Sequence, residues 1–204
     1  DTKSVAVVIG NSPLERFWLE VLRKDFAPFA DRLSFIWYND RSFADILKHA
    51  AALPPHSAIF WHQMNVGAAG VVHEGGKGLP TLYAVANAPI FSFSDAFFDG
   101  EVVGGPMNSV VEASRLTVTV AVRILGGEKA GDIKTPPIGF ATPMFDWRQM
   151  QRWGISEGRL PPGSKILFRS PTAWEQYRAY ILTVTAAILI QTALIFWMLY
   201  EHRR

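Results

Sequence analysis

The feature that most limits the fold of this chain is a stretch of 22 residues without a charged side chain, Ala179–Tyr200, near the end of the 204-residue sequence. As an α-helix it would be roughly 33 Å long, which is enough to cross the hydrocarbon core of a bilayer. Aromatic residues, which are typical of membrane interfaces, lie at both ends of the stretch: Trp174, Tyr177, Tyr180, Trp197 and Tyr200. We therefore expect a transmembrane helix, because a buried core helix is usually shorter.

Positive charge follows this stretch at His202–Arg204. Since Lys and Arg favour the cytoplasmic side of a membrane, we expect the C-terminal end to be cytoplasmic. Arg169 and Arg178, on the other side of the stretch, act against this orientation. The sequence begins at Asp1 without a methionine or a signal peptide, so we expect a piece of a longer protein.

Composition excludes several classes of function. The 20 basic and 18 acidic residues give a net charge of +2 and are well mixed, so the sequence lacks the basic stripe that nucleic-acid binding requires. There are no cysteines, which excludes disulfides, thiol catalysis and cysteine metal sites. The five histidines show no metal-ligand spacing on one helix, and we expect no metal and no cofactor.

Apolar runs alternate with helical patterns over the first ninety residues. The expected strands are Ser4–Gly10, Leu33–Tyr38, Ser57–His62 and Ala88–Ser94. Helical segments separate them, one starting at Pro13 with an inward stripe of Leu14, Phe17, Trp18, Val21 and Leu22, the others near Ser42–Ala52 and Pro80–Asn87. This alternation is typical of βαβ units and predicts an α/β fold with a parallel sheet.

Ligands of such sheets bind beyond the carboxyl ends of the strands. That rule marks Asn11, Ser12, Asn39, Asp40, His62–Asn65 and Ser94–Phe98. His62 is either a ligand contact or a strand-end histidine bonded to nearby backbone. Asp95 is either an acceptor for a ligand ammonium or hydroxyl, or a residue that orders the next turn. Phe97 either lines a pocket or belongs to the core.

The pattern changes after the fourth strand. The segment 110–125 reads as a helix, ended by Gly126–Gly127. Along one side it places Val111, Arg115, Val118, Val122 and Leu125. We expect a short strand in 136–142 and an amphipathic helix in 144–155.

Enzyme activity is not expected of this chain. The stretch Gly70–Gly78 has glycines and a lysine, but their spacing departs from that of a phosphate-binding loop. No G-x-S-x-G elbow and no Ser–His–Asp set can be placed by spacing.

Four segments together resemble a known family. They are "SVAVVIGNSP" (4–13), "PIFSFSDAFFDGEVVGGPMNSVVEASRLTVTVAVRILGGE" (89–128), "WRQMQRWGISEGRLPPGS" (147–164) and "WEQYR" (174–178). They resemble the C-terminal part of type I periplasmic binding proteins of the ABC-transporter substrate-binding family, most closely versions that form the extracytoplasmic sensor region of bacterial sensor histidine kinases. Two departures matter: the glycine that the family often has near Ser114 is absent, and so is the kinase itself.

The resemblance implies a parallel-sheet βαβ lobe, a partial second lobe and one C-terminal transmembrane helix. The implied parts are the α/β lobe reached second by the chain (1–88), a crossover with a remnant of the first lobe (89–142), a return segment (143–170), the membrane helix (179–200) and the start of a cytoplasmic linker (201–204). The implied location is the bacterial inner membrane, with the domain in the periplasm.

By the same resemblance, six residues would lie at the interlobe cleft: Asn11, Ser12, His62, Gln63, Ser94 and Asp95. With Phe97, taken as lining the pocket, they form the expected ligand-binding set. The implied partners are a small solute such as an amino acid, the lipid bilayer and a second copy of the chain, joined through the membrane helix by Gln191. The leading hypothesis is a sensor that signals to a cytoplasmic histidine kinase. The alternatives are a membrane-tethered binding protein of an ABC transporter and a degenerate α/β domain that only forms dimer contacts.

Overall fold

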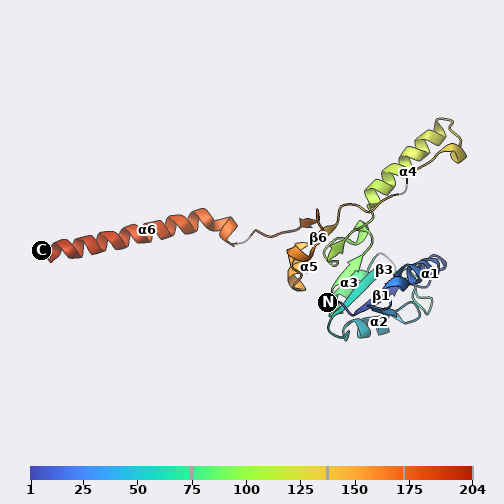
Figure 1. Cartoon of the computed structure of the whole chain (residues 1–204), viewed down its shortest axis with the longest axis horizontal. Coiled ribbons are helices and arrows are strands. Elements are labelled where there is room, and N and C mark those ends of the chain that lie inside the picture. The colour runs from blue at the N-terminus through green and yellow to red at the C-terminus, as the bar shows by residue number, and fades with distance from the viewer. Residues whose placement is uncertain (74–75, 137, 172, 204) are drawn as a thin grey trace. The chain divides into compact units, whose positions relative to one another are not determined.

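The computed structural model describes residues 1–73, 76–136, 138–171 and 173–203 (Figure 1). The chain forms two units, Asp1–Phe168 and Arg169–Arg204. The first contains all the strands, and the second is one long helix.

Unit 1 is built around a parallel sheet, as the sequence predicts. The strands are β1 (Ser4–Ile9), β2 (Ser34–Trp37), β3 (Ser57–Gln63) and β4 (Ile90–Ser92), in the order β2-β1-β3-β4. The connecting helices are α1 (Pro13–Phe26), α2 (Phe43–Ala50) and α3 (Gly78–Val85). Because the strand order reverses between β1 and β3, the topological switch point lies at the carboxyl ends of these two strands.

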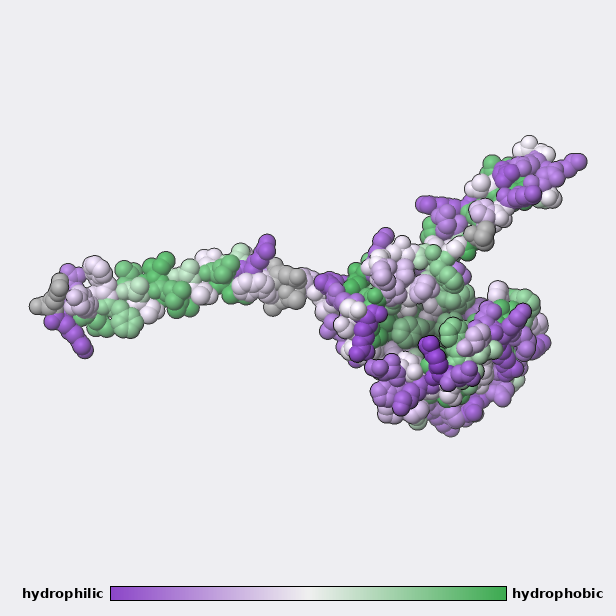
Figure 2. Space-filling model, in the orientation of Figure 1, coloured by the Kyte–Doolittle hydropathy of each residue, from purple (hydrophilic) through white to green (hydrophobic). Residues whose placement is uncertain are grey.

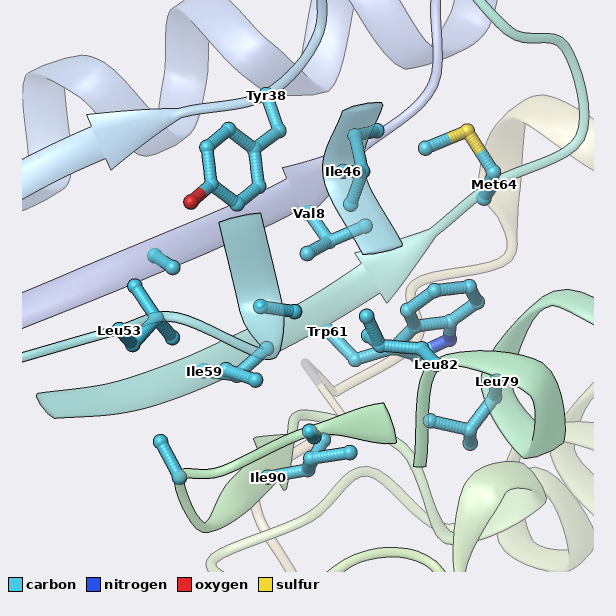
Figure 3. Close-up of a cluster of buried hydrophobic side chains, with 14 of the residues drawn as sticks. Val8, Tyr38, Ile46, Leu53, Ile59, Trp61, Met64, Leu79, Leu82 and Ile90 are labelled. Atoms are coloured by element: carbon cyan, nitrogen blue, oxygen red, sulfur yellow. The ribbon is translucent and has the colours of Figure 1, made fainter. Parts of the chain in front are cut away.

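Each face of this sheet has its own apolar cluster. On the face covered by α2 and α3, buried side chains from strands and helices pack together, among them Val8, Tyr38, Ile46, Ile59, Leu82 and Ile90 (Figure 3). On the α1 face, Val7, Ile9 and Leu19 are buried beneath a stack of aromatic rings. The sheet is therefore covered on both faces, as its nearly continuous apolar strands predict.

The predicted inward stripe of α1 is wrong in part. Leu14 and Phe17 are each 60% exposed, whereas Leu19 and Glu15 are buried. The helix is apolar along two stripes, and periodicity cannot tell which one faces the sheet. The orientation follows from Glu15, whose carboxylate binds backbone groups beneath the helix.

A second, smaller sheet follows. It consists of β5 (Gly104–Gly105), β6 (Met144–Asp146) and β7 (Lys165–Leu167), and α5 (Trp147–Arg152) starts directly after β6. Short 3-10 helices occur at Ala27–Phe29, Asp95–Phe97, Ala130–Asp132 and Glu157–Arg159. The helix predicted for 144–155 therefore begins three residues late, because Met144–Asp146 pair with both neighbouring strands.

The strand expected in 136–142 does not form at the positions that the structure describes there, 136 and 138–142, and Pro137 lies outside them. The predicted helix of 110–125 is confirmed as α4 (Val110–Leu125), which ends at Gly126. None of its residues is buried, although the sequence places apolar side chains around most of it.

Unit 2 is α6 (Ala173–His202), which confirms the predicted C-terminal helix. Its segment Gln176–His202 is long and apolar enough to cross a membrane, and its hydrophobic side chains are exposed. The predicted division of residues 1–170 into lobes, crossover and return segment stays a prediction.

Candidate ligand-binding site at the carboxyl edge of the sheet

At the switch point, backbone hydrogen bonds join the residues that follow β1 to the end of β3 and the loop after it. The Gly10 N–H donates to the Gln63 carbonyl at 2.8 Å, and the Asn11 N–H donates to the Val66 carbonyl at 2.7 Å. Asn11 and Gln63 therefore lie at the same edge of the sheet, as predicted, and both are half-buried.

Ser12 starts α1. Its hydroxyl accepts a hydrogen bond from the Glu15 N–H at 3.3 Å, and its own N–H donates to Glu15 Oε2 at 2.9 Å. This capping box satisfies two backbone groups of the helix start. The Ser12 side chain is thus already engaged in shaping the edge of the site.

Glu15 is 1% exposed and joins three segments. Besides Ser12, its carboxylate accepts a hydrogen bond from the Asn65 N–H at 2.6 Å. A side chain at Gly10 would collide with this carboxylate, so the close approach requires glycine there. Glu15 was absent from the predicted site, but the spacing Ser-x-x-Glu after a strand was the signal for its role.

His62 is the predicted site residue with an unused polar atom. Its side chain is 5% exposed, and its Nδ1 is buried with no hydrogen-bond partner among the residues that the structure describes. Burial lowers the pKa of His62 to about 4, although the negative charge of nearby Glu15 acts in the opposite direction. The imidazole is therefore neutral at pH 7. Because Nδ1 is shielded from solvent, a ligand can bond to it only after neighbouring side chains move.

Aromatic rings enclose His62. Its ring stacks on Phe93, with centroids 4.5 Å apart and an angle of 17°, and lies 6.0 Å from Trp18 of α1. Phe97 is 6.4 Å from both Phe93 and Trp61, so it links this group to the core of the opposite face. Sequence reasoning missed Phe93 and assigned Trp18 to the core, because it did not consider which stripe of α1 faces the strand ends.

Ser94 and Asp95 order the chain that follows β4. The Ser94 hydroxyl accepts a hydrogen bond from the Ala96 N–H at 3.3 Å. Asp95 Oδ1 accepts one from the Val110 N–H at 2.9 Å, at the start of α4. The Asp95 carboxylate therefore holds the start of α4, 15 residues along the chain, and not the turn that directly follows it, and its predicted contact with a ligand stays a prediction.

A second polar group connects the small sheet to the large one. Asp146 is fully buried and forms an ion pair with Arg148 at 2.6 Å. The Gln149 side-chain amide donates to the Tyr83 hydroxyl at 2.9 Å and to the Gly100 carbonyl. The two bonds of Gln149 hold α5 against α3 and against the loop at Gly100. No local pattern of residues signals this contact, because its partners are 66 and 49 residues apart.

The site offers hydrogen bonding and aromatic contact. Among the residues that the structure describes, no group of three or more His, Asp or Glu side chains is placed to hold a metal ion. What remains is a buried neutral imidazole beside two aromatic rings, a combination suited to binding a small molecule.

Solved structures show which fold this is. The chain is similar to a substrate-binding protein with adhesive properties from Clostridium difficile, in its ligand-free open form, with 10% identity and a TM-score of 0.58 over 83% of this chain and 56% of that one. It is also similar to an ABC domain from Streptococcus pneumonia in complex with L-Trp, with 15% identity and a TM-score of 0.58 over 81% and 55%. A conserved domain protein from Vibrio cholerae matches over the same shares, with 14% identity and a TM-score of 0.57.

Unit 1 has a periplasmic-binding-protein-like α/β fold. At these identities the likeness concerns the fold alone. This chain spans little more than half the length of each of the three proteins. No family model and no curated protein matches the sequence.

Proposed function

We propose that unit 1 binds a small, amino-acid-like solute at the carboxyl edge of its sheet and that its role is binding and not catalysis. The observation that carries the proposal is the buried, unpaired Nδ1 of His62 beside the ring of Phe93. The fold supports it, because two of the similar structures are described as a substrate-binding protein and as a domain in complex with L-Trp.

Energetics favour a ligand at this place. A buried polar atom without a partner costs about 1–3 kcal/mol, and a ligand that bonds to it recovers that energy. A neutral imidazole accepts a hydrogen bond from an ammonium or hydroxyl group without charge repulsion. Trp18, which is 41% exposed, and Phe93 offer flat apolar surface on the same side of the sheet. An amino acid with an apolar or aromatic side chain combines both features.

The same proposal gives α6 its role. We place it in the bacterial inner membrane, with unit 1 in the periplasm and Arg203 on the cytoplasmic side. Ligand binding would shift a two-state closure of the binding domain, and α6 would carry that shift to a cytoplasmic histidine kinase.

A membrane-tethered binding protein that delivers solute to an ABC transporter is the second candidate, which the similarity to substrate-binding proteins favours. The coding sequence after Arg204 separates the two, because a kinase supports sensing and a stop codon supports transport.

The partner of α6 in this proposal is a second copy of itself. Gln191 lies in the middle of the apolar segment, where an unpaired amide is costly in lipid. Across a helix pair the two amides can bond to each other. Replacing Gln191→Leu should weaken dimerisation in a membrane reporter assay, and unchanged dimerisation would remove this part of the proposal.

The binding proposal is tested with the full chain in lipid nanodiscs. Each of the twenty amino acids is tested for a rise in the melting temperature of unit 1, with unfolding monitored by tryptophan fluorescence. We expect at least one to stabilise the wild type and His49→Ala, whose histidine is exposed on α2, but not His62→Ala. Phe93→Leu, which keeps an apolar side chain, serves as a second variant in case His62→Ala does not fold. A ligand that stabilises His62→Ala as well as the wild type would refute the assignment.

A further inference from the structure

A hollow of unit 1 lies on the α1 side of the sheet and borders the switch-point site at Phe93. It has a volume of about 470 Å³, and its walls carry six phenylalanines: Phe26, Phe60, Phe91, Phe93, Phe140 and Phe145. Figure 2 shows apolar surface gathered in a hollow of this unit. We call it the phenylalanine groove. Cavities of about 300–1,000 Å³ with apolar walls are typical of small-molecule sites.

The groove is open because neither α1 on one side nor β5 and β6 on the other cover β4, the edge strand of the large sheet. Phe60 of β3 and Phe91 of β4 lie side by side in register and form its floor. On one side, α1 reaches only as far as Phe60, against which Phe26 packs edge-on at 5.5 Å. On the other side stand β5 and β6, with Phe145 facing the floor. The space between remains unfilled.

Two glycines form part of the groove wall. Gly104 and Gly105 line the groove, with φ angles of +123° and +141° that favour glycine. A side chain at Gly104 would collide with the Met144 carbonyl, whereas a Cβ at Gly105 would enter open space. Glycine at 104 therefore lets β5 approach β6 closely at the wall of the groove.

One ionisable side chain lines the groove, that of Asp25. No ion pair or hydrogen bond engages the Asp25 carboxylate within the ranges that the structure covers. It lies ten residues beyond Glu15 on α1, which is roughly 15 Å along the helix. The groove shares Phe93 with the switch-point site, but its charged end is separate from it.

Charge and shape together select a ligand class. The faces of aromatic rings attract cations and repel anions, and a carboxylate at the rim acts in the same direction. We propose that the phenylalanine groove is a second binding site, for a hydrophobic monocation with an aryl or alkyl body and an ammonium group that reaches Asp25. The proposal rests on Asp25 and the phenylalanine walls and does not depend on a solute bound at His62.

The test uses three probes of one shape and different charge: 4-phenylbutylamine, 4-phenylbutan-1-ol and 4-phenylbutyrate. Each is titrated calorimetrically into the full chain in nanodiscs, and the heat from empty nanodiscs is subtracted. We expect the amine to bind about tenfold more tightly than the alcohol and the carboxylate to bind most weakly. Asp25→Asn should reduce the preference for the amine to about twofold or less, whereas Asp31→Asn, a matched exposed carboxylate outside the groove, should preserve it.

A second pair of variants tests the apolar walls. Phe140 is 66% exposed, so Phe140→Ala should leave the fold intact and weaken all three probes. Phe29→Ala, at an exposed phenylalanine outside the groove, should weaken none. Equal binding of amine and carboxylate would overturn the charge assignment, and probe binding that Phe140→Ala leaves unchanged would overturn the site.

Two other outcomes also overturn the proposal. Loss of amine binding in His62→Ala but not in Asp25→Asn would place the probe at the switch point. Self-association of the chain that Phe140→Ala abolishes, measured by mass photometry, would assign the groove to a second copy. A failure of the solute screen at His62 leaves these probe results unaffected, so the two proposals fail separately.

Discussion

Helices α1 and α4 begin in the same way and differ in what covers them. Both start with Ser-x-x-Glu, at Ser12 and at Ser109, and both carry apolar side chains at helical spacing. In α1 the glutamate is buried and completes a capping box, and Leu19 packs into the sheet. In α4 Glu112 is exposed, only the serine cap forms, and no residue of the helix is buried.

The difference shows that the spacing of apolar residues in a sequence predicts a helix but not the element against which that helix packs. The polar side chains of α4 that point one way, Glu112, Arg115, Thr119 and Arg123, cover less than half of its circumference at 100° per residue. The remainder is mainly apolar, interrupted by Ser114 and Thr117, and a helix with so wide an apolar surface is normally buried. Helix α1 is thus packed on the sheet along one side, whereas α4 has no buried side and displays the kind of apolar surface that is found at interfaces.

The largest effect is expected where α1 packs on the sheet, a contact that α4 lacks. Leu19→Ala removes a side chain that is 4% exposed between α1 and the sheet. It should lower the free energy of unfolding of unit 1 by about 3–4 kcal/mol, from lost apolar burial and the cavity left behind. Urea denaturation followed by tryptophan fluorescence measures this, and a loss below about 1 kcal/mol would contradict the described packing of α1.

The next effect compares the two glutamates. Glu15→Ala leaves the N–H groups of Ser12 and Asn65 without their acceptor and should cost about 3 kcal/mol. Glu112→Ala, at the equivalent position of α4, loses an exposed ion pair with Arg115 and should cost less than about 0.5 kcal/mol. An equal loss of unfolding free energy in the two variants would mean that Glu15 and Glu112 lie in similar environments.

The third effect is a pH dependence from His62. Its pKa in the folded state is about 4, below the ordinary value of 6.5, so the unfolded chain binds the proton first as the pH falls. The free energy of unfolding should therefore decrease by about 2 kcal/mol between pH 7.5 and pH 5 because of this group. Comparing urea denaturation of the wild type with that of His62→Gln at both pH values isolates the contribution. The same pH slope in both would show that His62 is not buried as a neutral group.

The smallest effect belongs to α4. Val118 is 62% exposed, so Val118→Ser should change the free energy of unfolding by less than about 0.5 kcal/mol. A loss of 2 kcal/mol or more would show that α4 is covered in solution and would remove the contrast with α1.

The predictable part of the fold is the part in which neighbours in sequence are neighbours in space. Alternating apolar runs and helical segments identify the parallel sheet, and the rule of strand ends places Asn11, His62 and Gln63 at one edge of it. These inferences need only local patterns and general topology.

The remainder depends on distant contacts. Trp18 lies beside His62 because α1 packs on the sheet through Leu19, an orientation that periodicity cannot decide. Phe93 lies there because it follows β4, which pairs with β3. Met144–Asp146 form a strand because Gly104–Gly105 and Lys165–Leu167 supply partners on both sides. Such pairings are set by tertiary context and leave no signature in a local window of sequence.

The central claim, that His62 is the polar contact of a bound solute, is tested most directly by nitrogen-15 NMR of the histidine side chains. The full chain, labelled at histidine and held in nanodiscs, is titrated with the amino acid that stabilises it most. We predict that the ring nitrogens of His62 shift on saturation, while those of the exposed His49 and His56 do not. Saturable binding without a shift at His62 would contradict the claim.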